Sequence, residues 1–313
     1  PDELKWNVAF GLAAVVMVIS LLTFTQTQKS LGEIGLSPLL HLDKSKRKFY
    51  EWSTYIGSIL IVPIIIIMVS NTVYTDYFMY AIGPISILYL AYEMKGFSII
   101  ENKKLVAAVI FMLFSIVFWA FFEQSGGSLS DFAAENLNNT VLGLPLDPNG
   151  VNNSANSFFV IAFAALVGLV WLWLSKRKIE PNTIIKFGLA FLFLAGGFWI
   201  FYYTKFFADA SGKTSLDLFT FGWFIITFGE LCLSPIGMSA MTKLSPQKTQ
   251  AVIMGMWFLA SAYGQYFAGI LGANIANASP TFLVANLLNS SSMFPDSLTD
   301  SGYCFSSFCL FIE

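Results

Sequence analysis

The stretch GELCLSPIGMSAMTKLSP, residues 229–246, contains a carboxylate inside an otherwise apolar run that begins near Leu218. A charge at that depth in a membrane is expensive unless it is paired, hydrated or used. Ser234 follows Glu230 by four residues, so a helix would place both polar groups on one face. Pro235 then leaves a backbone carbonyl without its usual donor. The stretch therefore predicts a membrane helix that carries a polar site.

The composition of the chain indicates that it lies in a membrane. Of 313 residues, 56% are hydrophobic and only 12% are charged, whereas soluble domains carry roughly 25% charged residues. Such a chain belongs in a bilayer. The three cysteines, Cys232, Cys304 and Cys309, show no metal-like spacing with the single His41, so neither a disulfide framework nor a metal site is expected.

Eight apolar runs are long enough to cross a bilayer core about 30 Å thick. They are Trp6–Phe24, Ser53–Ser70, Tyr74–Tyr92, Lys103 to about Phe122, Phe158–Leu174, Ile184–Tyr203, Leu218–Met241 and Ala251–Ile275. A polar segment rich in Asn, Gly and Ser, Glu123–Asn156, separates the fourth run from the fifth. We therefore predict an all-α membrane protein with about eight transmembrane helices.

The placement of basic residues tests this count, because cytoplasmic loops of membrane proteins are enriched in Lys and Arg. If the first span ends in the cytoplasm, the loops on that side hold 14 of the 17 basic residues: Lys29, Lys44, Lys46, Arg47, Lys48, Lys95, Lys103, Lys104, Lys176, Arg177, Lys178, Lys186, Lys243 and Lys248. The segment Glu123–Asn156 has none. This sorting supports the number of spans and their orientation, and it argues against a soluble helical bundle.

Both ends of the chain depart from this regular pattern. The chain opens on Pro1 with an apolar run almost at once, so we expect a piece of a longer protein. After Pro280 the apolar runs Phe282–Leu288 and Tyr303–Ile312 are too short to span, and a polar, Ser-rich segment separates them. We expect an abnormal tail in place of a last span.

Two carboxylates are candidates for chemistry, since ionisable groups in the predicted spans are few. Glu230 lies deep in its span, and Glu123 ends its own span after the aromatic run FWAFF. Burial in a low-dielectric medium favours the neutral form of a carboxyl group, so both could carry a proton. The alternatives are a structural ion pair for Glu230 and an ordinary interfacial acid for Glu123.

Three further residues each have two interpretations. Asn156, at the start of the Phe158 span, is either a helix cap or a hydrogen-bonding site residue. Ser234 either belongs to the site or bonds to its own helix backbone. Trp257 either lines a cavity or packs between helices.

A spacing of four residues marks two faces of the span that contains Trp257. Gly264, Ala268 and Gly272 form one face, and such small residues allow close helix contact. The other face, with Trp257, Ser261 and Gln265, is left as a candidate cavity wall.

Longer motifs carry a family resemblance. The sequences FWAFFEQSGGSL at Phe118–Leu129, GELCLSPIGMSAMTKLSP at 229–246 and MGMWFLASAYGQYFAG at Met254–Gly269 are together similar to the proton-dependent oligopeptide transporters of the major facilitator superfamily. Asn156 falls where that family has an asparagine opening its eighth span. The resemblance extends from Trp6 to about Ala278.

The resemblance implies a symporter that imports di- and tripeptides with the proton gradient, in the bacterial inner membrane. It implies no cofactor, no enzymatic activity and no nucleic-acid partner; the expected partners are the peptide, protons, the lipid bilayer and the missing N-terminal half. Glu230 would bind the peptide amino group, with Asn156, Ser234 and Trp257 as further substrate-site residues. Glu123 would serve proton coupling or gating, together with Glu230.

The resemblance also implies a domain organisation within a partial major facilitator fold. Residues 1–30 would be the last span of an N-terminal half, and residues 31–104 a cytoplasmic linker with two extra helices. Residues 105–280 would be spans seven to eleven of the C-terminal six-helix half, followed by the atypical tail at 281–313. The family's ExxER-type motif and cationic residues lie in its N-terminal spans, and nothing here matches them. We therefore expect that this chain holds half of the cavity wall and cannot transport alone.

Other functions compete with this interpretation. A related transporter could carry nitrate or an organic acid, and competition by dialanine would separate the two. An intramembrane enzyme is disfavoured by a single His and by the lack of a paired nucleophile and base in the sequence. A non-transporting receptor and a non-functional truncated product also remain open.

Overall fold

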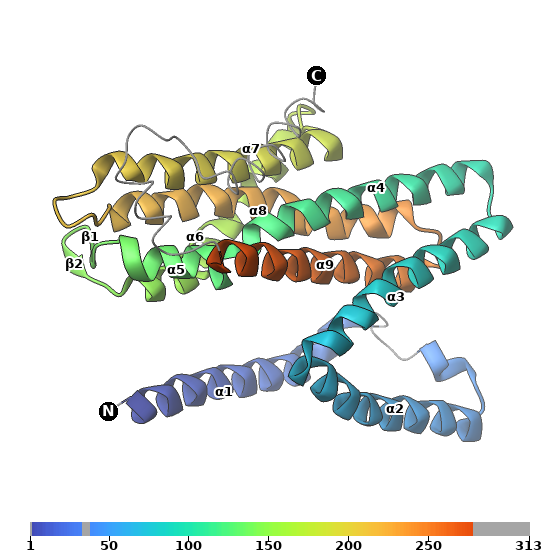
Figure 1. Ribbon diagram of the computed structural model, residues 1–313. Helices are drawn as coiled ribbons and strands as arrows, with labels where there is room; N and C mark the ends of the chain where they lie inside the picture. Colours follow the sequence, from blue (N-terminus) through green and yellow to red (C-terminus); the bar gives the residue numbers. More distant parts are fainter. Residues whose placement is uncertain (1, 33–37, 278–313) are drawn as a thin grey trace. The chain divides into compact units, whose positions relative to one another are not determined.

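The computed structural model describes residues 2–32 and 38–277. In these ranges the chain folds into long helices joined by short connections (Figure 1). The α-helices are α1 (Asp2–Thr27), α2 (Lys44–Ser70), α3 (Thr72–Glu93), α4 (Ile99–Phe122), α5 (Ser128–Asn136), α6 (Pro148–Lys176), α7 (Thr183–Tyr203), α8 (Leu216–Leu244) and α9 (Gln250–Asn277). The short 3-10 helices are η1 (Gln28–Leu31), η2 (Pro38–His41), η3 (Met94–Gly96), η4 (Glu123–Gly126) and η5 (Thr204–Phe207).

The predicted spans correspond to helices. All eight predicted positions are helical, as α1 to α4 and α6 to α9. Six of the described helices are long and apolar enough to cross a membrane. The helices α3 and α9 fall outside these six; both contain tyrosines and glycines, which lower the mean hydropathy. The all-α, multi-pass membrane class is confirmed, whereas the predicted tail lies outside the described residues.

The polar segment before α6 is more ordered than its sequence indicates. It contains η4, α5 and a hairpin of two short antiparallel strands, β1 (Thr140–Val141) and β2 (Leu144–Pro145). Helix α6 begins ten residues earlier than the apolar run, because the Asp147 side chain accepts from the Gly150 N–H and Pro148 occupies the first turn. The apolar run alone therefore places the start of this helix too late.

The chain divides into two compact units, Pro1–Phe78 and Met79–Glu313. In the first unit, the apolar stretches of α1 and α2 that could cross a membrane contain no buried residue. Side chains such as Met17 and Ile59 are more than 70% exposed. The second unit contains the packed helices and both candidate sites.

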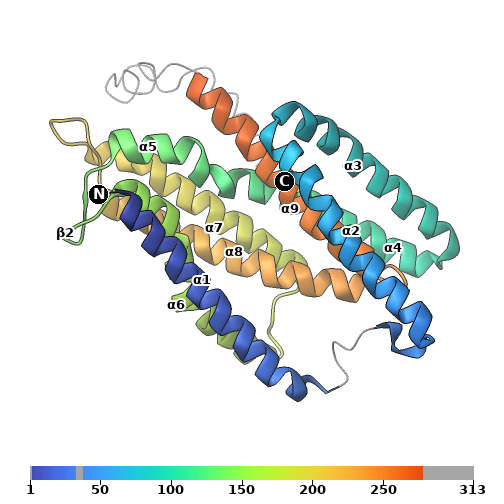
Figure 2. The same cartoon turned by 90° about the horizontal axis from the view of Figure 1, so that it is seen from below.

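Helix α8 is the centre of the second unit, where it contacts α4, α6, α7 and α9. Figures 1 and 2 show α7 and α8 running side by side. Glycines allow this approach: a Cβ on Gly197 would lie 2.2 Å from Ile226, and one on Gly229 would lie 2.8 Å from the Ala190 carbonyl oxygen. The backbones of α7 and α8 are thus in direct contact beside Glu230.

Helices α4 and α9 pack through the small-residue face that the sequence predicts. A Cβ on Gly264 would lie 2.3 Å from the Trp119 Cβ, and Gly272 packs against Gly127. The Gln124 amide donates to the Ala268 carbonyl at 3.3 Å. The predicted contact face of α9 is confirmed.

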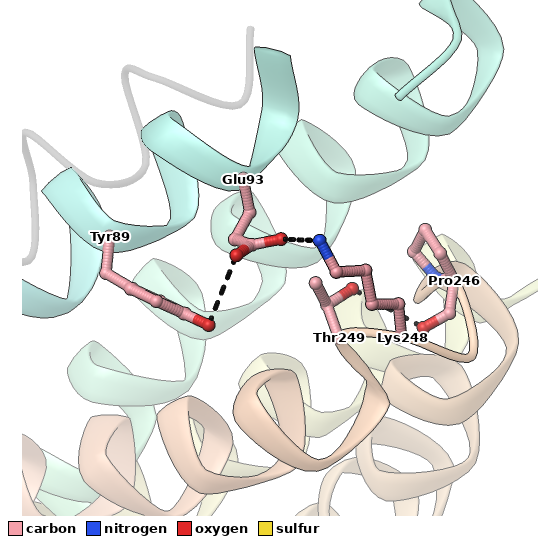
Figure 3. A network of polar contacts seen from close by, with 5 residues as sticks. All are labelled: Tyr89, Glu93, Pro246, Lys248 and Thr249. Carbon is pink, nitrogen blue, oxygen red and sulfur yellow. Dashed lines mark hydrogen bonds and ion pairs between the residues drawn. The ribbon is translucent and has the colours of Figure 1, made fainter. Parts of the chain in front are cut away.

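Helix α3 is hydrogen-bonded to Tyr263 of α9 and forms an ion pair with Lys248 in the loop before α9. The Tyr263 hydroxyl donates to the Met79 carbonyl and accepts from the Gly83 N–H at 2.9 Å, so it is inserted into an i to i+4 pair of α3. At the loop after α8, the Lys248 ammonium pairs with the Glu93 carboxylate at 2.7 Å, and the Tyr89 hydroxyl donates to the same carboxylate (Figure 3). The pKa of Lys248 is raised by this hydrogen bond and by the charge of Glu93.

Candidate functional site

Glu230 lies in the interior of α8, half-buried, and its closest partner comes from α6. The Asn156 amide donates to Glu230 Oε2 at 2.8 Å and to the Thr227 hydroxyl at 3.2 Å. The Thr227 hydroxyl in turn donates to the Trp223 carbonyl at 2.8 Å. A chain of side-chain hydrogen bonds therefore fixes the carboxylate between two helices.

The structure decides between the two interpretations of Asn156. Because α6 begins at Pro148, Asn156 lies about two turns inside the helix and is not a cap. Its amide is a donor to the site. The carboxylate of Glu230 has no ion-pair partner among the described residues, so the alternative of a structural ion pair is not what this structure contains.

A cavity of about 680 Å³ opens beside Glu230, between α6, α8 and the start of α7. Ser234 lines it one turn beyond Glu230, as the four-residue spacing predicts. Leu231 also lines it, and its carbonyl lacks the usual i+4 donor because Pro235 has no N–H. This part of the cavity wall thus combines an acidic residue, a hydroxyl-bearing residue and a residue whose carbonyl lacks its helical donor.

The other end of the same cavity carries a buried cation that sequence reasoning assigned to a cytoplasmic loop. Lys186 lies in the first turn of α7 and is only 7% exposed. Its ammonium pairs with Glu180 and lies 4.6 Å from the centre of the Trp171 ring. The pairing, with a Ser175 hydrogen bond, holds the pKa of Glu180 below its usual range. Lys243 of α8 lines the cavity as well.

A signal for Lys186 was present in the sequence. Asn182 is a favoured N-cap residue, and its side chain accepts from the Ile185 N–H at 2.9 Å. Lys186 follows that cap by four residues and therefore belongs to the helix. The sequence prediction counted Lys186 among the basic residues of the loop and therefore missed its position in α7.

Glu123 occupies a different cavity. It ends α4 as predicted, and its carboxylate accepts from the Gln265 amide at 3.2 Å. The cavity, of about 630 Å³, also has Asp131 and several glycines and alanines in its wall. No Lys or Arg is among the described residues that line it.

Trp257 does not line the cavity of Glu230. Its side chain is 2% exposed, and its ring packs against Gly237, where a Cβ would lie 2.2 Å from the ring. It also contacts Phe187 with ring centres 6.4 Å apart. Of the predicted cavity wall on α9, Gln265 lines the cavity of Glu123, and the Ser261 hydroxyl bonds to the Trp257 carbonyl.

Metal chemistry has no candidate site in the part of the chain that the structure describes. Within residues 2–32 and 38–277, no three His, Cys, Asp or Glu side chains gather in a way that could hold an ion. The polar groups of the two cavities can bind cations, anions and protons through hydrogen bonds and charge.

Comparisons with known proteins agree with this architecture. The chain is 29% identical over 286 residues to the peptide transporter YePEPT of Yersinia enterocolitica, covering 86% of this chain and 56% of that protein. It is 27% identical to dipeptide and tripeptide permease B of Aeromonas hydrophila, covering 88% and 54%. The chain spans about half the length of the curated relatives it matches.

A solved structure and a family profile also show similarity to peptide transporters. A crystal structure of peptide transporter POT in complex with sulfate superimposes with a TM-score of 0.63 at 28% identity, covering 90% of this chain and 58% of that one. The profile of the POT family matches residues 2–286. The chain, a multi-pass membrane protein with a half-buried carboxylate facing a cavity, belongs to the POT family.

Proposed function

We propose that the protein acts in proton-coupled symport of di- and tripeptides across the bacterial cell membrane. The names of the Yersinia and Aeromonas relatives support the substrate class. The observation that carries the proposal is the Glu230 carboxylate, which is fixed by Asn156 and faces a cavity of about 680 Å³. A cavity of that volume is within the usual range of small-molecule sites.

The carboxylate of Glu230 suits two competing ligands. One oxygen accepts from Asn156, so other lone pairs remain for a substrate ammonium or for a proton. Because a proton and an ammonium that compete for one carboxylate would exchange, symport requires the transported proton to be held on a second group while the peptide is bound, and Glu123 is the candidate. The proton gradient then drives uptake.

The remaining predicted residues take supporting roles in this proposal. Asn156 orients Glu230, and Ser234 offers a hydroxyl one turn away. Glu123 serves gating or proton coupling from the second cavity. Trp257 remains a predicted pocket residue, and its packing on Gly237 connects α9 to α8 beyond the cavity wall. The predicted domain boundaries, with residues 105–280 as the C-terminal half, are part of the proposal.

Uptake in proteoliposomes tests the proposal. An acid-outside gradient should drive accumulation of labelled dialanine by the full-length protein, and Glu230→Gln should reduce it to background, because the amide can neither titrate nor pair with an ammonium. Glu135→Gln, which changes an exposed carboxylate of α5 that lines neither cavity, is the matched control. Gradient-driven uptake at the wild-type rate by Glu230→Gln would remove Glu230 from the mechanism.

A transporter of small anions is the second candidate. Lys186 and Lys243 on the cavity wall favour it, since nitrate and organic acids need cationic partners. Competition separates the candidates: unlabelled dialanine should block uptake of labelled dialanine, and nitrate in equal excess should not. The reverse pattern would favour the anion transporter.

A further inference from the structure

We propose that Asn152 is a positioning residue that links the two carboxylates, Glu123 and Glu230, through helix α6. The inference rests on the proposed function, in which Glu230 binds the peptide ammonium and Glu123 holds the transported proton. It starts from two hydrogen bonds made by α6. Asn156 donates to the Glu230 carboxylate at 2.8 Å. One turn earlier, Asn152 donates at 2.8 Å to the carbonyl of Ser125, two residues after Glu123.

The start of α6 presents asparagines on one face, and each of them bonds a different element. Asn149, Asn152 and Asn156 follow one another by three and four residues, which is the spacing of a single helix face. Asn149 accepts from the Ser130 hydroxyl of α5 at 3.2 Å. Asn152 bonds η4, and Asn156 bonds α8. The anchors of η4 and of Glu230 therefore lie only about 6 Å apart along the axis of α6.

Burial makes Asn152 a fixed anchor. Its side chain is 1% exposed, and its amide oxygen has no hydrogen-bond partner among the described residues. Within that part of the chain, the hydrogen bonding of this side chain is therefore directed to the Ser125 carbonyl. Water readily replaces a donor at the surface, whereas a buried donor is not replaced when its side chain is removed.

The bond matters for Glu123 because the chain turns there. The 3-10 helix η4 begins at Glu123, directly after α4, so the direction of the Glu123 side chain depends on how η4 leaves α4. Two buried amides hold this turn from two other helices. Gln124 donates to the Ala268 carbonyl of α9 at 3.3 Å, and Asn152 donates from α6. Asn152 thus ties the turn to the helix that also holds Glu230.

The turn of α6 between the two anchors connects the two sites. Hydrogen-bond networks and rigid helices carry energetic coupling between sites, and here a single helical turn separates Asn152 from Asn156. Symport requires the proton and the peptide to be held at the same time, so Glu123 and Glu230 must keep their relative positions. Without the Asn152 donor, the peptide site keeps its own bond and the turn at Glu123 loses its anchor.

The test separates gradient-driven uptake from counterflow. In counterflow, labelled dialanine exchanges for unlabelled dialanine without a gradient, so it requires the peptide site but no net movement of protons. Asn152→Ala in the full-length protein should lower gradient-driven uptake by about tenfold, the factor that corresponds to one buried hydrogen bond. Counterflow and the KM for dialanine should change by less than about threefold, because Asn156 still donates to Glu230.

Asn153→Ala is the matched control. Asn153 is the next residue of the same helix, is exposed, and donates only to the Asn149 carbonyl of its own helix among the contacts described. It should leave both kinds of transport at the wild-type rate. Asn152→Leu repeats the test with a side chain of similar size and branching, which separates the loss of the amide from the loss of packing. Thermal melting of each purified variant shows whether it is folded.

The ratio of gradient-driven uptake to counterflow decides the outcome, because a loss of folded protein lowers both and leaves their ratio unchanged. A ratio that falls about tenfold in both Asn152 variants, and not in Asn153→Ala, supports the link between the two carboxylates. An unchanged ratio in the Asn152 variants, or an equal fall in Asn153→Ala, would overturn the link while leaving the proposed function in place. Failure of the wild-type protein to take up dialanine would overturn the proposed function and this inference together.

Discussion

Glu230 and Glu123 face cavities of similar volume, about 680 and 630 Å³, but the two regions are built differently. Glu230 is in the interior of a central helix, accepts from an amide of another helix at 2.8 Å, and shares its cavity with two lysines. Glu123 is at a helix end and accepts from an exposed glutamine at 3.2 Å. Its cavity has acidic but no basic residues among those described.

The difference indicates where a zwitterion can bind. A zwitterion has one positive and one negative end, and the Glu230 cavity is lined by both acidic and basic side chains. The Glu123 region offers carboxylates and no cation among the residues described. We therefore expect recognition to depend on the first region more than on the second, and paired substitutions test this.

Removing the amide partner of each carboxylate should give the largest difference in dialanine affinity between the two regions. Asn156→Ala leaves a half-buried carboxylate without its donor, so the apparent affinity for dialanine should fall by about tenfold to a hundredfold, corresponding to about 1.5–3 kcal/mol. Gln265→Ala should change it less than about threefold, because water replaces an exposed partner. Competition assays with labelled dialanine measure both. Equal effects would mean that the two regions are not distinct.

Adding a methyl group beside each carboxylate should affect stability unequally. Gly229→Ala places a Cβ 2.8 Å from the Ala190 carbonyl oxygen, and such overpacking costs about 1–3 kcal/mol. Gly126→Ala meets nothing within 4 Å and should leave the melting temperature nearly unchanged. Thermal melting in detergent measures this contrast, which an unaffected Gly229→Ala variant would contradict.

Thr227→Val tests whether the hydrogen-bond chain behind Asn156 matters. Valine keeps the shape but removes the hydroxyl that accepts from the Asn156 amide at 3.2 Å, a loss of about 1 kcal/mol or fivefold in affinity. Thr220→Val, at a half-buried position of the same helix whose hydroxyl bonds only its own backbone among the contacts described, is the control. If the Asn156 amide keeps Glu230 ordered without Thr227, the two variants should have the same affinity for dialanine.

The smallest effect concerns the pH dependence of stability at the Glu180–Lys186 pair beside the Glu230 cavity. The pKa of Glu180 is lowered from 4.5, first by the Lys186 hydrogen bond. A lowered folded-state pKa stabilises the protein above the unfolded value, and this contribution is lost as the pH falls through the folded value. Melting temperatures should therefore decline below about pH 4.5 less steeply in Glu180→Gln than in the wild type. Parallel curves of melting temperature against pH would show that the Glu180–Lys186 pair contributes nothing to stability.

Much of the fold could be predicted from the sequence, because membrane helices leave a strong local signal. An apolar run must be long enough to cross the bilayer and must satisfy its own backbone, so all eight predicted runs are helical. The start of α6 was predicted ten residues too late, because a cap and a proline extend the helix into a polar segment. The hairpin of β1 and β2 was missed, since strands of two residues carry almost no periodicity.

The candidate site was predicted in part. By itself, the sequence determined that Glu230 is a costly intramembrane acid and that Ser234 shares its face, because charge burial and helical periodicity act along one chain segment. Only the tertiary structure decided that Asn156 is a donor to Glu230, that Trp257 packs away from the cavity, and that Lys186 shares it. These facts depend on how α6, α7 and α9 pack on α8, and that packing arises from contacts between residues far apart in the sequence.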